Sequence, residues 1–184
     1  LHSFPTRRSS DLDLFPMKYN INSAFGGGNW NDLTKAMLSN DNAYKRYSVT
    51  FVDNHDTYRD NNKLRSNICA ANAYILAMPG TPCLFLKHWQ SNKGTLKRLI
   101  ALRKAAGITN ESEIVSAETI GGRFLLVVKG SKGSLRLHLG PVGEITFANP
   151  VDLWTLAIEG KNFQVYANKD VDLTTMKAIT EADE

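Results

Sequence analysis

The stretch Tyr47-Ser48-Val49-Thr50-Phe51-Val52-Asp53, followed directly by Asn54-His55-Asp56-Thr57, decides the fold. Its first seven residues are rich in β-branched and aromatic side chains, which favour a buried strand. Polar residues begin where this apolar run ends. The sequence therefore predicts a strand over 47–53 whose carboxyl end presents an amide, an imidazole and a carboxylate.

The segments that follow this strand alternate between helix and strand. Residues 63–78 carry apolar side chains on one stripe at spacings of three and four, which is typical of an amphipathic helix; these are Leu64, Ile68, Ala71, Ile75 and Met78. Pro79-Gly80 ends that helix, and residues 81–89 predict a second buried strand. A last helix is expected over 95–106, capped by Gly107.

The segments before the strand continue the same alternation. We expect a short extended piece over 14–19, a flexible loop at Gly26-Gly27-Gly28, and a helix that begins at Asn31 or Asp32 and runs to about Ser39. Strands alternating with helices are typical of parallel β/α units. Residues 13–108 therefore predict about two and a half such units.

After Gly107 the period changes to that of antiparallel strands. Gly121-Gly122 is a favoured hairpin loop. Strands are predicted over 114–119, 123–129, 134–139, 151–158 and 163–167. The formal charge also divides here, with +8 on residues 1–109 and −4 on 110–184. We therefore expect a small antiparallel sheet or sandwich over 109–184 as a second domain.

The opening segment 1–12 has no strand or helix period and resembles the translation of a sequencing adapter. We expect it to be a non-native segment in place of genuine upstream sequence, and it is left out of the fold prediction.

The polar residues at the end of strand 47–53 have two interpretations. In a β/α barrel, catalytic groups project from the carboxyl ends of strands, where an acid beside a histidine can stabilise positive charge or hold sugar hydroxyls. Alternatively, Asp56 caps the next segment and His55 is an ordinary loop histidine. For an arbitrary sequence the second interpretation is favoured.

Several strings, in order along the chain, resemble the α-amylase family, glycoside hydrolase family 13. They are Phe15-Pro16-Met17-Lys18-Tyr19, Phe51-Val52-Asp53-Asn54-His55-Asp56-Thr57, Ala73-Tyr74-Ile75-Leu76-Ala77-Met78-Pro79-Gly80-Thr81-Pro82 and Gly160-Lys161-Asn162-Phe163 with Val165-Tyr166. The resemblance implies that residues 13–108 are the end of a (β/α)8 TIM barrel, with about strands six to eight and their helices. Residues 109–184 would be the family's C-terminal β domain.

The resemblance also implies roles for three residues in a retaining hydrolase of α-1,4-glucan. Asp56 would be the third catalytic acid, which stabilises the transition state, His55 would bind the same sugar, and Asn54 would position the pair. The family's nucleophile and acid/base belong to barrel strands four and five, and no carboxylate of residues 13–184 matches their motifs. We therefore expect a fragment of an α-amylase that catalyses nothing alone.

The loop at Leu86-Lys87 departs from the family, which more often has an aromatic residue and then a small or imino residue there. Trp89 could stack on a sugar or pack on the last helix. Tyr58 and Arg59 could likewise line the cleft or be merely exposed. Substrate specificity therefore stays open at the sequence level.

Parts of the sequence are compatible with two other functions. The C-terminal sheet could be a non-catalytic glucan-binding module through Trp154, Tyr166 or Phe163, although strand alternation favours those aromatics as core residues. Six basic residues between Lys87 and Lys104 could bind nucleic acid, but an amphipathic helical pattern favours a solvated face. We expect no nucleic-acid partner.

The expected partner is an α-glucan polysaccharide or oligosaccharide. No run of about 18 apolar residues is present, so no membrane association is expected. We expect no cofactor and no metal site in this chain, since residues 13–184 hold no recognisable calcium loop. The resemblance makes calcium possible in the full-length parent.

Overall fold

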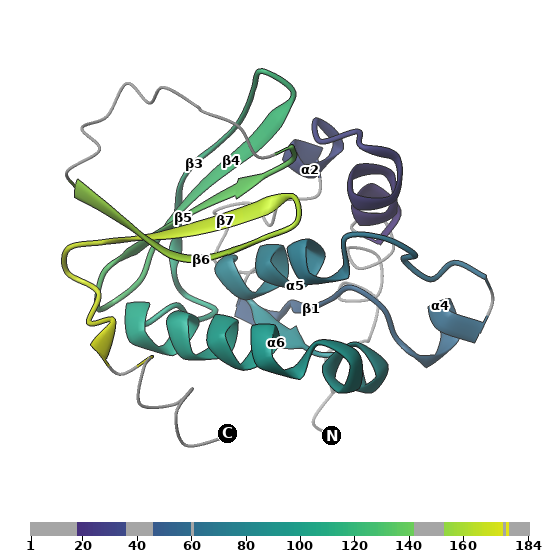
Figure 1. The fold of residues 1–184 in the computed structure, drawn as a ribbon, viewed down its shortest axis with the longest axis horizontal. Helices are drawn as coiled ribbons and strands as arrows, with labels where there is room; N and C mark the ends of the chain where they lie inside the picture. Colours follow the sequence, from purple (N-terminus) through teal and green to yellow (C-terminus); the bar gives the residue numbers. More distant parts are fainter. Residues whose placement is uncertain (1–17, 36–45, 60, 142–152, 175, 177–184) are drawn as a thin grey trace, which may run out of the picture.

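The computed structural model describes residues 18–35, 46–59, 61–141, 153–174 and 176. Over these residues the chain forms a mixed α/β fold with a two-stranded parallel sheet, a five-stranded antiparallel sheet and helices between them (Figure 1). The segment 1–12, predicted to be non-native, lies outside the described residues.

The parallel sheet consists of β1 (Val49–Phe51) and β2 (Thr81–Cys83), with Val49 opposite Thr81 and Phe51 opposite Cys83. Helix α5 (Ile68–Ala77) lies between them in the chain, so the three elements form a β/α unit. Both predicted strands are present and both are shorter than predicted, but their burial was predicted wrongly: Thr81 and Cys83 of β2 are exposed, and in β1 only Thr50 is buried. A larger barrel that includes this pair stays a prediction.

Helix α5 begins at Ile68, five residues later than the sequence pattern predicts. The Leu64 amide donates to the Asp53 carboxylate, 3.1 Å from Oδ2, and Asn67 has a left-handed φ of 56°. These contacts hold residues 63–67 in a loop. Residues 70–77 are buried all round the helix because α5 lies between α6 and the five-stranded sheet (Figure 1).

Helix α6 (Leu86–Ala106) begins nine residues earlier than predicted and includes His88 and Trp89, which were expected at the end of a strand. Asn92 interrupts it, with φ −136° and ψ 29°, so two helical pieces join at a kink. Gly107 ends α6 in the left-handed conformation, φ 68°, as predicted.

The N-terminal segment contradicts two predictions, because Gly26 and Gly27, expected in a flexible loop, are helical, and so is part of the expected extended piece. Residues 18–27 are helical and include the π-helix η1 (Asn22–Gly26), so the expected extended piece over 14–19 is wrong at Lys18 and Tyr19. Lys18 Nζ donates to Asn22 Oδ1 at 2.8 Å, a contact four residues apart that a helix permits. Helix α2 (Asp32–Lys35) begins where predicted, and residues 36–39 lie outside the described residues.

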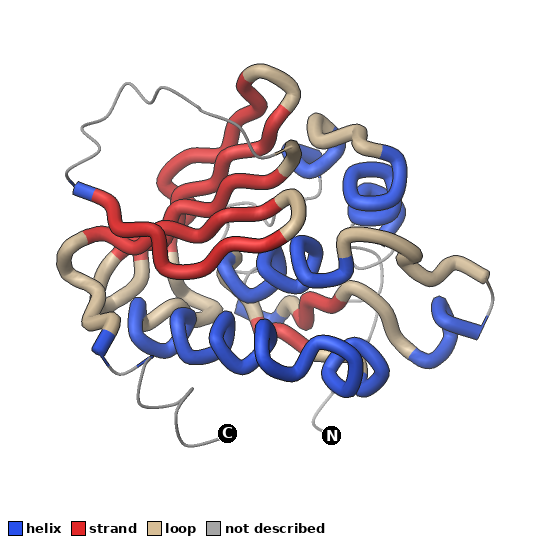
Figure 2. The backbone as a smooth tube through the Cα atoms, in the orientation of Figure 1, coloured by secondary structure: helices blue, strands red, loops and turns tan. Residues whose placement is uncertain are grey.

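The antiparallel sheet confirms the five predicted strands and the hairpin at Gly121-Gly122. It comprises β3 (Glu113–Ile120), β4 (Arg123–Lys129), β5 (Ser134–Leu139), β6 (Trp154–Gly160) and β7 (Phe163–Asn168). The strands lie in the order β3-β4-β5-β7-β6 (Figure 2). Gly121 and Gly122, both with positive φ, form the β3–β4 turn.

One hydrophobic core runs from Ile21 to Met176 through α5, α6 and the five-stranded sheet, and it includes Val52 directly after β1. Within this core the Tyr74 ring of α5 lies between two other aromatic rings, 6.1 Å from that of Phe25 and 5.9 Å from that of Phe124 on β4. The division into domains 13–108 and 109–184 stays a prediction. Among the helices that the structure describes, none has the length and apolar character to cross a membrane.

Candidate functional site

Residues Asn54-His55-Asp56, called the 54–56 turn below, follow β1 and begin helix α4 (His55–Arg59). Asn54 Oδ1 accepts the backbone N–H groups of Asp56 (3.0 Å) and Thr57 (2.9 Å). The Thr57 hydroxyl accepts the backbone N–H of Asn54 at 3.0 Å. Asn54 is therefore the N-cap of α4, and its bonds fix the backbone that carries His55 and Asp56.

His55 and Asp56 point their functional groups toward solvent, with side chains 83% and 58% exposed. His55 Nε2 lies 3.4 Å from Asp56 Oδ1, and Arg59 Nη2 lies 3.0 Å from the same oxygen. Such an exposed pair is worth little to stability. Both side chains are therefore exposed to a ligand, as the enzymatic interpretation requires, and the cap of α4 is Asn54 rather than Asp56, which the alternative interpretation expected.

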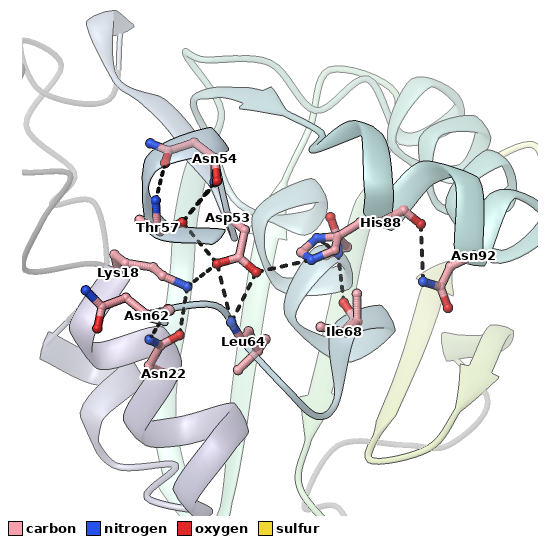
Figure 3. A network of polar contacts seen from close by, with 11 residues as sticks. Lys18, Asn22, Asp53, Asn54, Thr57, Asn62, Leu64, Ile68, His88 and Asn92 are labelled. Atoms are coloured by element: carbon pink, nitrogen blue, oxygen red, sulfur yellow. Dashed lines mark hydrogen bonds and ion pairs between the residues drawn. The ribbon is translucent and has the colours of Figure 1, made fainter. Parts of the chain in front are cut away.

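Beneath the turn lies a buried carboxylate, Asp53, whose contacts define the Asp53 network: Lys18, Asp53, Thr57, Leu64 and His88 (Figure 3). Lys18 Nζ lies 2.5 Å from Oδ1 and His88 Nε2 lies 3.1 Å from Oδ2. The Thr57 hydroxyl donates to Oδ1 at 3.2 Å. A buried charge is tolerated only when it is paired and hydrogen-bonded, and Asp53 meets both conditions.

The electrostatics of this network keep Asp53 ionised. Burial by itself raises the pKa of Asp53, but the contacts with His88 and Lys18 and the charge of Lys18 outweigh burial and hold this pKa below its ordinary 3.8. Burial lowers the pKa of Lys18, and the bond and charge of Asp53 oppose that effect. At neutral pH the carboxylate therefore carries its negative charge beneath the turn.

The segments that follow β1 and β2 meet at a second cluster, the Tyr58 cluster, which is formed by Tyr58 of α4, Lys63, Phe85 and Lys87 of α6. The rings of Tyr58 and Phe85 are 5.1 Å apart, and the ammonium groups of Lys63 and Lys87 lie 4.7 and 4.9 Å from the Tyr58 ring. The cluster places an aromatic face one helical turn from the 54–56 turn. Trp89, by contrast, is half-buried and packs against the core.

Sequence reasoning assigned no role to Asp53, Lys18 or His88. An acid in the last position of an apolar strand is a detectable signal, because such a residue rarely stays buried without a partner. The partners could not be found in this way, since Lys18 and His88 were expected in extended segments and are helical.

The aromatics considered for a glucan-binding module separate onto two faces of the antiparallel sheet. Phe163 is 1% exposed and belongs to the core. Trp154 and Tyr166 are half-buried outside that core, where the Arg136 guanidinium lies 5.5 Å from the Trp154 ring and the Tyr166 ring lies 4.8 Å from that of His138.

The basic helix does not present all its charges to solvent. The buried Arg103 guanidinium donates to the carbonyls of Leu76, Met78 and Gly80 at 2.6, 2.6 and 2.7 Å. This side chain serves the fold. Within the described ranges no cluster of three His, Cys, Asp or Glu side chains could hold a metal ion, and calcium in a longer parent stays a prediction.

The fold and the site define a class: an α/β protein with a polar, carboxylate-bearing turn at the carboxyl end of a parallel strand, where β/α enzymes carry their active sites. Comparison of the sequence with known proteins gives its relatives. The chain is 34% identical to an α-amylase type B isozyme of Hordeum vulgare over 99 residues, which are 51% of this chain and 63% of that protein.

Two further relatives agree. A glucan 1,4-α-maltotetraohydrolase of Stutzerimonas stutzeri is 31% identical over 68% of this chain and 25% of its own length. A probable α-amylase 2 of Arabidopsis thaliana is 29% identical over 65% of this chain and 29% of its own length. No family model matches the chain. The chain is thus related to the α-amylases, and it spans less than two thirds of each of these relatives.

Proposed function

We propose that this chain is part of a retaining α-amylase-type glycoside hydrolase and that its 54–56 turn binds an α-1,4-glucan. Asp56 would stabilise positive charge on the reacting sugar, His55 would hydrogen-bond the same sugar, and Asn54 would hold both. The observation that carries the proposal is the exposed pair of His55 and Asp56 on a backbone fixed by Asn54.

The surroundings of the turn support a sugar ligand. The Asp56 carboxylate supplies a charged acceptor for hydroxyl groups, and the His55 imidazole supplies a second hydrogen-bonding group. Tyr58 lies in the same short helix and lines the site, with its ring held against Phe85 and the ammonium groups of Lys63 and Lys87. The names of the relatives, α-amylases and maltotetraohydrolases, agree with a glucan as the ligand class.

The test of binding compares two exposed carboxylates that each face an arginine. Asp56→Asn should weaken the binding of maltoheptaose at least about fivefold, because the hydroxyls lose a charged acceptor. Glu111→Gln is the control, since Glu111 lies 3.6 Å from Arg46 near the opposite end of β1. Equal affinities of the two variants, measured by calorimetry, would count against the role of Asp56.

The 184 residues contain one motif carboxylate of the three that retaining glycosidases of this type use, so we expect no hydrolysis by this polypeptide. The measurement is the release of reducing sugar from soluble starch by the purified chain, with Asp56→Asn as the blank. Release of more reducing sugar than in that blank would contradict the expected inactivity.

A second candidate is glucan binding on the outer face of the antiparallel sheet. The observation that favours it is the position of Trp154 and Tyr166 outside the core. In the full chain, Trp154→Ala should abolish retention on a starch column under this candidate. Under the first proposal, Trp154→Ala leaves retention unchanged and Asp56→Asn reduces it.

A further inference from the structure

The Thr57 hydroxyl connects two sets of contacts that otherwise lie apart. It donates to Asp53 Oδ1 at 3.2 Å in the buried Asp53 network, and it accepts the Asn54 N–H at 3.0 Å (Figure 3). Asn54 Oδ1 in turn accepts the N–H groups of Asp56 and Thr57. A continuous series of hydrogen bonds therefore runs from a buried carboxylate to the exposed turn.

The buried end of this series is held by three separate parts of the chain. Lys18 comes from the N-terminal helical segment, the Leu64 amide from the loop before α5, and His88 from α6 after β2. Lys18, Asp53 and His88 are 3%, 2% and 5% exposed. The position of the Asp53 carboxylate is thus fixed from several directions, while α4 has only one buried side chain, that of Thr57.

Stability alone is a poor reason for such a network. Removing two charges from water costs several kcal/mol per ion, and well-packed apolar side chains of similar volume often stabilise a fold as well or better. Apolar side chains have no hydrogen-bond acceptor, so they cannot orient the O–H bond of a hydroxyl group. The Asn54 carbonyl lies 3.3 Å from the same hydroxyl, and the fixed, charged carboxylate is the stronger acceptor of the two. The Asp53 carboxylate therefore orients the Thr57 O–H, which leaves a lone pair of the same oxygen for the Asn54 N–H.

We propose that Thr57 is a positioning residue which, through its bond to Asp53, sets the geometry of the 54–56 turn for its ligand, with Lys18 and His88 holding Asp53. This inference rests on the proposed function for the identity of the ligand only. The hydrogen-bond series itself is independent of it.

The experiment uses Thr57→Val in the full chain, because valine matches threonine in shape, removes the hydroxyl and leaves every buried charge in place. Exchange of the Asp56 and Thr57 amides with water, followed by NMR, should become at least about tenfold faster as Asn54 loses its anchor. Thr57→Ser keeps a hydroxyl and should restore the slow exchange. Lys18→Met should accelerate the same amides by loosening Asp53.

Arg103→Met is the control, since it removes buried hydrogen bonds at the other end of α5. It should accelerate exchange around Met78 and not at the 54–56 turn. Unchanged Asp56 and Thr57 amides in Thr57→Val, or acceleration equal to that in Arg103→Met, would overturn the inference.

Binding of maltoheptaose separates this inference from the proposed function. If the unmodified chain binds the glucan, Thr57→Val should weaken the affinity and Thr57→Ser should not; equal affinities would contradict the role of Thr57 in ligand geometry. If the unmodified chain does not bind, the proposed function fails, while amide exchange still decides whether Thr57 positions the turn.

Discussion

His138 is a histidine held in a strand where protonation is costly. It lies on β5, 5% exposed, with its ring 4.8 Å from that of Tyr166. Burial, and then the positive charges of Arg136 and Arg123, lower the pKa of His138 from 6.5 to about 4. The folded chain therefore keeps this imidazole neutral over a range in which an unfolded chain protonates it.

This difference predicts a pH-dependent stability. Between about pH 4 and 6.5 the unfolded state binds the extra proton, so the free energy of unfolding rises with pH, by up to about 3 kcal/mol for a shift of this size. His138→Gln should flatten the rise. Urea unfolding at pH 4.5, 5.5 and 7 measures it, and equal slopes for both proteins would refute the assignment. Asp53 contributes separately, since its stabilisation is lost only below its ordinary pKa of 3.8.

Among single residues, sequence reasoning placed the exposed groups of the 54–56 turn and missed their buried support. Asn54, His55 and Asp56 form a local motif that can be read along the chain. Along the sequence, Lys18 precedes Asp53 by 35 residues and His88 follows it by 35. Such contacts depend on how helices pack, which a single sequence does not determine.

At the level of elements, the carboxyl end of α5 depends on one side chain from α6. The last carbonyls of a helix have no partner within it. The Arg103 guanidinium donates hydrogen bonds to the carbonyl oxygens of Leu76, Met78 and Gly80, at and just after this end of the helix. Burial lowers the pKa of Arg103 to about 10, so the group remains charged at neutral pH.

Arg103→Met should therefore lower the free energy of unfolding by about 3 kcal/mol, because buried carbonyls lose their donors. Arg103→Lys should cost less, since an ammonium keeps the charge but lacks the planar fork that reaches carbonyls on both sides. Chemical denaturation of the three proteins gives the order. A methionine variant as stable as the natural chain would show that water replaces the guanidinium.

The hairpins were predicted more accurately than the helices. Gly121-Gly122 fixes the β3–β4 turn locally, and the strand bounds follow from alternation. The predicted first residues of α5 and α6 were wrong because contacts between distant residues determine them. The Leu64 amide donates to Asp53, and His88, in the first turn of α6, contacts the same carboxylate.

At the scale of the whole molecule, the hydrophobic core of the described residues continues across the predicted domain boundary at residue 108. Tyr74 of α5 contacts Phe25 on one side and Phe124 of β4 on the other. Asn162 Nδ2, in the β6–β7 turn, donates to Asn67 Oδ1 before α5 at 2.9 Å. Contacts of this kind couple the sheet to the helices.

The chain should consequently unfold in one cooperative transition. Tryptophan fluorescence reports on Trp30, Trp89 and Trp154, which lie near α2, in α6 and in β6, and circular dichroism reports on all elements. The two probes should give the same midpoint in urea. Two separated transitions would instead favour independent domains at 13–108 and 109–184.

The central claim is that the 54–56 turn of this α-amylase relative contacts an α-glucan. The most direct test is a titration of the isotope-labelled chain with maltoheptaose, followed by NMR signals of the backbone and of the His55 ring. We predict shifts that centre on His55, Asp56 and Tyr58 and that require at least about fivefold more glucan in Asp56→Asn. Shifts confined to Trp154 and Tyr166 on the antiparallel sheet, or no shifts at millimolar glucan, would contradict it.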